Sequence, residues 1–290
     1  MNGNWRERLR GDPAPWLLDY ADNPSVYFWF LRDIVGRPED APALLDARDR
    51  ILYSAPVQEV FAAQDESGFW GNPDSLDTPR YRATLWSLAL LAELGVPRAS
   101  RRARAASEFV LQNHLAEDGS FAGLSDSPQV GLLMHALLYF RNRQDARLAP
   151  AIERLAEWAA EGDVFALWAL TEIPREQCSP TVQTAVVRGA DKLLDALACG
   201  DYPTFGAFPS FDGNDALLAL RVLTRLGCAN DSRTNAVIEK IWERQGEGAR
   251  WQLEKSYNGW LAARVEEIGT PSKWATLNVL RVVVGRQVDR

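Results

Sequence analysis

Apolar positions recur at helical spacing along most of the chain, in two kinds of segment that alternate. Segments of the first kind carry a charged face opposite an apolar one, and they cover residues 43–64, 99–114, 147–160, 181–198 and 232–244. Segments of the second kind have hardly any polar face, and they cover residues 81–94, 129–140, 163–172, 213–226 and 273–284. A helix that is apolar on all sides must be buried on all sides. The pattern therefore predicts amphipathic helices outside and apolar helices inside.

Paired in chain order, these segments form five helical hairpins, and a leading helix is predicted over residues 24–35. A ring of outer helices around inner helices would bury every apolar helix. We therefore expect an all-α fold, an α/α toroid (barrel) of about five to six helical hairpins with an inner and an outer helix ring. No linker rich in Pro, Gly or Ser interrupts the chain. Residues 1–290 are expected to form one domain, in which residues 1–40 are an N-terminal extension with one helix packing on the ring.

A short motif recurs between the two kinds of helix: a Gln, then a Gly and an aromatic residue. Its copies are Gln64, Gly68 and Trp70; Gln112, Gly119 and Phe121; and Gln245, Gly248 and Trp251. The Gln residues lie 48 and then 133 residues apart, and the larger spacing is close to three periods of about 45 residues. This period is typical of stacked two-helix units.

With these residues the chain resembles the squalene-hopene cyclases and related triterpene cyclases, whose glutamine-tryptophan repeat is similar to Gln64, Gly68 and Trp70. It looks like a short bacterial member of the prenyltransferase and squalene-oxidase repeat group, within the superfamily of terpenoid cyclases and protein prenyltransferases. The resemblance covers residues from about 40 to 285. It implies a toroid with an apolar cavity and a terpenoid-cyclase-like activity, isomerase or lyase, on a polyprenyl-type or similar hydrophobic small molecule. The Gln and aromatic residues of the repeat are expected to be structural.

Two aspartates open one of the predicted inner helices, in the segment Asp212-Gly-Asn-Asp215. In triterpene cyclases, the resemblance implies an aspartate-rich DxDD signature at such a place, whose middle aspartate protonates an alkene. Here Asn214 stands where that acid belongs, and an amide cannot donate the proton that a carboxylic acid can. Asp212 and Asp215 remain candidate catalytic residues. The alternative is that Asp212 is an N-cap and Asp215 an acid of the first helical turn.

Histidine occurs twice in the chain. His114 lies at the predicted end of an outer helix and is expected to be structural, whereas His135 is the strongly polar side chain within a predicted inner helix. A histidine at such a place is more often a hydrogen-bonded core residue than a general base. His135 is nevertheless the third candidate catalytic residue.

Aromatic side chains on or near the predicted inner helices are candidates for substrate binding, because an aromatic face stabilises a cation by about 0.5 to 2 kcal/mol. They are Tyr81, Trp86, Tyr139, Phe165, Trp168, Phe208, Phe211 and Trp274. Aromatic residues at helical spacing also form ordinary hydrophobic core. Both interpretations stay open at this point.

Composition and charge narrow the possible functions. The net charge of −7 argues against a surface that tracks nucleic-acid phosphates, and the basic run Arg98–Arg104 is expected to be the solvated face of a helix. The chain has no Asp-Asp pair for magnesium, and no cysteine follows an Asp at the spacing of the prenyltransferase zinc site, so we expect no metal and no cofactor. Three cysteines without CxxC spacing fit a reducing compartment. With no signal-peptide core and no stretch of 18 apolar residues, the sequence predicts a cytoplasmic, bacterial-type protein without a transmembrane segment.

Two other functions fit the same pattern. A non-catalytic toroid that binds a hydrophobic ligand or a protein partner would explain the absence of the aspartate-rich motifs. An (α/α)6 carbohydrate-active enzyme would use two carboxylates and stacking tryptophans in an open cleft. No sequence pattern specifies an oligomeric state.

Overall fold

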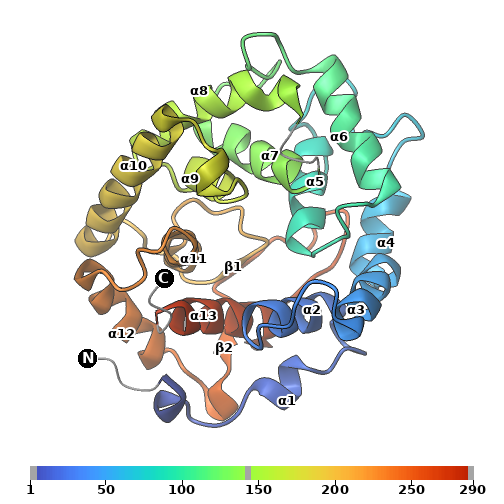
Figure 1. Ribbon diagram of the computed structural model, residues 1–290. Helices are drawn as coiled ribbons and strands as arrows, with labels where there is room; N and C mark the ends of the chain where they lie inside the picture. Colours follow the sequence, from blue (N-terminus) through green and yellow to red (C-terminus); the bar gives the residue numbers. More distant parts are fainter. Residues whose placement is uncertain (1–4, 141–144, 287–290) are drawn as a thin grey trace. The chain divides into compact units, whose positions relative to one another are not determined.

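The computed structural model describes residues 5–140 and 145–286, and this part of the chain is mainly helical (Figure 1). Two helices lead the chain, α1 (Ala14–Leu17) and α2 (Pro24–Asp33). The amphipathic helices are α3 (Pro42–Tyr53), α4 (Ala55–Ala62), α6 (Arg101–Asn113), α8 (Ala149–Ala160), α10 (Pro180–Cys199) and α12 (Asn235–Glu243). The helices that match the predicted inner helices are α5 (Thr84–Glu93), α7 (Ser127–Phe140), α9 (Val164–Leu170), α11 (Ala216–Arg225) and α13 (Lys273–Gly285).

Short elements connect these helices. The 3-10 helices are η1 (Trp5–Arg8), η2 (Ala146–Leu148), η3 (Arg175–Gln177), η4 (Ser232–Thr234) and η5 (Glu247–Ala249). Strand β1 (Ala207–Phe208) pairs in parallel with β3 (Lys255–Ser256), and β2 (Trp251–Gln252) pairs in antiparallel with β4 (Pro271–Ser272). No helix within the described residues combines the length and the apolar character needed to cross a membrane.

All five predicted inner helices are present, with ends that differ by a few residues. The apolar character is wrong for α11, which has a polar face with Arg221, Thr224 and the exposed Arg225. One amphipathic prediction is wrong in detail, because residues 43–64 form two helices, α3 and α4. Ser54 between them has extended backbone, with ψ of 145°. Pro56 follows in the first turn of α4. A proline has no N–H for the helical ladder, and its ring clashes with the carbonyl four residues earlier, so a continuous helix cannot run through position 56.

The chain divides into two compact units. The first comprises the described parts of Met1–Ser54, Leu194–Ser256 and Val265–Arg290, and the second comprises Ala55–Leu193 with Tyr257–Arg264. We describe each unit by itself. The single domain and the closed ring expected from the sequence therefore stay predictions.

In the second unit, α7 packs between α5 and α9. Every residue of α5 and α9 is buried, as is α7 from Val130 onwards. Gly131 lies at the contact of α7 with α9, where an added Cβ would stand 2.6 Å from the Cβ of Phe165. The absent side chain thus permits the close approach of these two helices.

Trp70 anchors the first copy of the Gln-Gly-aromatic motif in the second unit. Its backbone N–H donates to Oγ1 of Thr84 at 3.0 Å, and its indole N–H donates to the carbonyl of Val60 at 2.7 Å. The Thr84 hydroxyl in turn donates to the carbonyl of Trp70 at 3.2 Å. Gln64 donates to the carbonyl of Arg102 at 3.1 Å, in the first turn of α6. The motif therefore joins one amphipathic helix, the next apolar helix and the next amphipathic helix.

Trp251 makes the same contacts in the first unit. Its backbone N–H donates to Oγ1 of Thr276 at 3.0 Å, and its indole N–H donates to the carbonyl of Ile241 at 2.8 Å. Gln245 accepts a hydrogen bond from the N–H of Arg10 and donates to the carbonyl of Arg8 at 3.3 Å. The structural role expected for the Gln and Trp residues of these two copies is confirmed.

The middle copy of the motif departs from this pattern. The N–H of Ala116 donates to the carbonyl of Ser120 at 2.9 Å, just as the N–H of Asp65 donates to the carbonyl of Phe69 at 2.9 Å. A Gln directly precedes the turn at Asp65, whereas Gln112 precedes Ala116 by a full helical turn. Its side chain bonds to a Glu of its own helix. Gln112 is therefore not the counterpart of the other two Gln residues, and the spacing of 48 residues was misleading.

We expect Thr84→Val to lower the free energy of unfolding by about 2 kcal/mol, because valine keeps the shape but leaves buried N–H and C=O groups of Trp70 without partners. Thr276→Val should cost a similar amount. The control is Thr184→Val on α10, whose exposed hydroxyl bonds to Pro180. Chemical denaturation followed by tryptophan fluorescence measures all three variants. Equal stability of the Thr84 and Thr184 variants would contradict the expectation.

Candidate functional site

The predicted site residues divide between the two units. The first unit contains Asp212, Asp215, Phe208, Phe211 and Trp274. The second unit contains His135, Tyr81, Trp86, Tyr139, Phe165 and Trp168. Each group is described within its own unit.

Asp215 is the N-cap of α11, the place that the sequence interpretation gave to Asp212. Its carboxylate accepts three backbone hydrogen bonds, from Gly206 at 2.9 Å, Ala207 at 2.8 Å and Leu217 at 2.8 Å. Burial raises the pKa of Asp215 to about 6, although these three N–H groups favour the ionised form. The carboxylate thus fixes β1 to the start of α11, which is the role of a structural cap.

Asp212 lies three residues before this cap and is ion-paired. Its Oδ2 lies 2.8 Å from Nζ of Lys255, and its Oδ1 accepts a hydrogen bond from the N–H of Asn214 at 3.0 Å. Although partial burial opposes the effect, the Lys255 ammonium and the Asn214 N–H lower the pKa of Asp212. Asp212 is therefore ionised near neutral pH, which suits charge pairing better than proton donation.

The aromatic candidates of the first unit pack against one another. Phe208 stacks on Trp274 with ring centroids 4.0 Å apart and planes 13° apart, and both side chains are buried. Phe211 is buried as well. The stack joins β1 to the first turn of α13, so it positions the helix starts that carry Asp215 and the Ser272 cap.

Glu266 is a carboxyl group that the sequence interpretation missed. It accepts hydrogen bonds from the Ser272 hydroxyl, from the N–H of Lys273 at 2.9 Å and from the N–H of Trp274 at 3.3 Å. Burial raises the pKa of Glu266 to about 7, and nearby Asp22 adds to the shift. The residue lies in a connection seven positions before α13, where no helical spacing pointed to it.

In the second unit, His135 on α7 lies next to the buried carboxylate of Glu172. Its Nε2 lies 3.7 Å from Oε1 of Glu172, which follows α9. The imidazole also stacks on Trp168 of α9, with ring centroids 3.9 Å apart and planes 27° apart. The predicted pair of His135 and Trp168 is thus in contact, and Glu172 is the partner that the sequence did not reveal.

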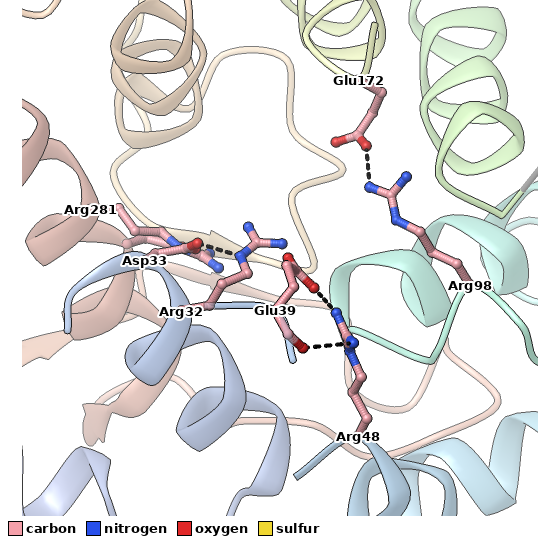
Figure 2. Close-up of polar contacts among 8 residues, drawn as sticks. Arg32, Asp33, Glu39, Arg48, Arg98, Glu172 and Arg281 are labelled. Carbon is pink, nitrogen blue, oxygen red and sulfur yellow. Dashed lines mark hydrogen bonds and ion pairs between the residues drawn. The ribbon is translucent and has the colours of Figure 1, made fainter. Parts of the chain in front are cut away.

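Arg98 completes this cluster (Figure 2). Its Nη2 donates to Oε2 of Glu172 at 2.9 Å, and its guanidinium lies 4.6 Å from the ring centroid of Tyr139. The Tyr139 hydroxyl donates to the carbonyl of Val96 at 3.1 Å. Arg98 precedes α6, and its side chain is 44% exposed, so it stays in contact with solvent, as expected for this run, while it pairs with the buried carboxylate of Glu172.

Tyr81 and Trp86 belong to a separate aromatic cluster of the second unit. Tyr81 lies 4.9 Å from Trp86, 4.9 Å from Tyr257 and 5.5 Å from Trp260 between ring centroids. Tyr81 has a φ of +66°, which is a strained conformation for a residue other than glycine. Trp260 is 63% exposed, so one edge of this cluster reaches solvent. Phe165 takes no part in it and packs against α7.

The His135 cluster has the chemistry of a proton acceptor. The Arg98 guanidinium pairs with Glu172, and that carboxylate faces the imidazole of His135. A carboxylate beside an imidazole orients the ring and stabilises the charge that the ring gains with a proton. The face of Trp168 covers the ring.

No group of three His, Cys, Asp or Glu side chains that could hold a metal ion occurs in the described part of the chain. Comparison with known proteins gives no relative, since no family model, no curated protein and no solved structure matches the chain.

Glu266 generates a pH prediction. Because its pKa rises from 4.5 to about 7 on folding, its favourable contribution is complete below about pH 4.5 and is lost as the pH rises through about 7. We expect Glu266→Gln to reduce the fall in unfolding free energy between about pH 5 and pH 8, by an amount of the order of 2 kcal/mol. Denaturant titrations across this range measure the slope. The exposed neighbour Glu267 provides the control, because Glu267→Gln should keep the wild-type dependence of the unfolding free energy on pH. An identical pH dependence in both variants would contradict the raised pKa of Glu266.

Proposed function

We propose that the chain is an α/α toroid of about five to six helical hairpins, built from repeats like those of the terpenoid cyclases and forming a single domain. The observation that carries the proposal is the repeated hydrogen-bond set around Trp70 and Trp251. Three residues of the first copy each lie 181 residues before their counterparts: Val60 before Ile241, Gln64 before Gln245 and Trp70 before Trp251. An identical offset for a helix carbonyl, a turn amide and an indole is what internal duplication of one unit produces.

The contacts of Gln245 support closure of the ring. Gln64 bonds to Arg102 in the amphipathic helix that follows it in the chain. Within the described residues no amphipathic helix follows Gln245, which bonds instead to Arg8 and Arg10. The N-terminal segment therefore takes the place of the following unit, as a circular arrangement of repeats requires.

The function we propose for this toroid is that of a terpenoid-cyclase-like enzyme, isomerase or lyase, that accepts an apolar polyprenyl-type substrate. In a polyprenyl diphosphate, the C–O bond breaks and the diphosphate leaves with the bonding electron pair, which creates a cationic centre. His135, with Glu172 and Arg98, then acts as the base that removes a proton from the carbon beside this centre, which leaves an alkene and an imidazolium. Trp168 stacks on this base, and Tyr139 packs against the guanidinium of Arg98. Asp212 is ion-paired, so alkene protonation by the aspartate route of the triterpene cyclases is not part of the proposal.

A second candidate function is a toroid that binds a hydrophobic ligand without converting it. The observation that favours it is the position of Asp215, whose carboxylate is occupied by three backbone N–H groups. In this case Asp215 serves only as the N-cap of α11 and donates no proton to a ligand.

The activity test compares two buried histidines. We expect the wild-type protein to convert polyprenols or polyprenyl diphosphates, and His135→Gln to lower the rate at least about 100-fold, because a general base contributes factors of this size. His114→Gln is the control, since His114 caps α6 and bonds to the carbonyl of Pro73 at 2.8 Å. Products are measured by gas chromatography with mass spectrometry.

Loss of product in both variants alike would contradict the role of His135. Binding of a polyprenol by the wild-type protein without any product would support the second candidate function. Neither binding nor turnover of these compounds would reject both.

A further inference from the structure

A cluster of arginines in the first unit has more positive than negative charge. Arg32 of α2 and Arg281 of α13 share one carboxylate, with Nε of Arg32 at 2.6 Å from Oδ1 of Asp33 and Nε of Arg281 at 2.7 Å from Oδ2 (Figure 2). Both arginines lower the pKa of Asp33, although burial opposes them, so this carboxylate stays ionised. The three charged groups therefore carry a net charge of about +1.

The same two arginines cover one aromatic ring. The guanidinium carbon of Arg32 lies 4.0 Å from the ring centroid of Trp29, and that of Arg281 lies 4.9 Å from it. Stacking on an indole holds a guanidinium in place without using its N–H groups. The cluster thus presents two fixed guanidinium planes.

Several donors of this cluster have no acceptor. Nη1 of Arg281 donates to Oδ1 of Asn278 at 2.8 Å. Within residues 5–140 and 145–286, no group accepts a hydrogen bond from either Nη of Arg32, from Nη2 of Arg281 or from Nδ2 of Asn278. Asn278 is only 2% exposed, whereas the side chains of Arg281 and Arg32 are 14% and 28% exposed. None of these nitrogens is among the buried side-chain atoms of the described residues that lack a partner, so they contact solvent and can donate to water or to a bound anion.

The positive charges around Arg281 also favour the binding of an anion. Burial lowers the pKa of Arg281 to about 10, and the charges of Arg221 and Arg32 lower it further against the effect of Asp33. Arg48 shows the contrasting, balanced case, because it pairs with Glu39 (Figure 2). An anion bound beside Arg281 would neutralise the excess positive charge of the Arg32, Asp33 and Arg281 cluster.

We propose that Arg32, Arg281 and Asn278 form a binding site for a phosphate-type oxyanion. Guanidinium groups bind phosphate oxygens through pairs of parallel N–H bonds, and a buried amide N–H₂ supplies a further neutral donor. Asp33 and Trp29 hold the two guanidinium groups in place. The anion is either a free phosphate or diphosphate, or the head group of a prenyl phosphate.

The test is isothermal titration calorimetry with three probes: inorganic pyrophosphate, geranyl diphosphate and geraniol. We expect both diphosphates to bind more tightly than geraniol. Arg32→Gln should weaken the binding of the diphosphates at least about tenfold, since a charge-assisted hydrogen bond has that value. Arg50→Gln is the matched control, because Arg50 forms an exposed ion pair with Asp46 on α3. It should bind as the wild type does.

Tighter binding of geranyl diphosphate than of pyrophosphate would identify the head group of a prenyl phosphate, and equal binding a free anion. Arg32→Lys is a second variant that controls for a folding defect in Arg32→Gln, because lysine keeps the positive charge but lacks the paired N–H groups of a guanidinium. We expect this variant to bind diphosphate with intermediate affinity and to keep the wild-type thermal unfolding midpoint. The proposal is overturned if neither diphosphate binds, or if both bind to Arg32→Gln as to the wild type. The result is independent of turnover, so failure of the proposed enzyme activity leaves this test intact.

Discussion

The architecture depends on the way in which a buried tryptophan satisfies its backbone. The N–H and C=O of Trp70 both bond to one threonine hydroxyl at the start of the next helix, while its indole N–H bonds to the end of the preceding helix. A buried peptide group without partners would cost about as much as a lost hydrogen bond. A threonine hydroxyl in the first turn of the apolar helix satisfies the buried N–H in both copies, from Thr84 at the first position of α5 and from Thr276 at the fourth position of α13.

Several polar groups at the apolar helices are satisfied by backbone or by charge, although the buried Oγ of Ser127 on α7 has no hydrogen-bond partner among the described residues. Asp215 and Ser272 cap helix starts, and Glu266 accepts from the first N–H groups of α13. Away from the helix starts, His135 depends on Glu172 and Arg98. A buried carboxylate needs a cation or several N–H donors nearby. For His135, the neighbouring connections thus supply charges that α7 itself lacks.

Helical periodicity predicted the existence of the helices well, because an unbroken apolar face leaves few alternatives. The break at Ser54 was missed, since it depends on the backbone around one proline. Periodicity also aligned Gln112 with the wrong position, because a shift of three residues along a helix barely changes the pattern. Recognition of His135 and Trp168 required only their place on apolar helices. Glu172 is the last residue of the predicted helix over 163–172 and lies beyond the observed end of α9, and Arg98 lies in a connection; spacing along the chain does not show that these residues meet His135.

The contact between α7 and α9 shows how a missing group can set the geometry of a site. His135 follows Gly131 by one helical turn on α7, and Trp168 follows Phe165 by one turn on α9. The ring separation of 3.9 Å between His135 and Trp168 therefore depends on the bare Cα one turn earlier. One methyl group at position 131 would act as a spacer and move the imidazole away from the indole. The geometry of this pair thus depends partly on a position that carries no side chain.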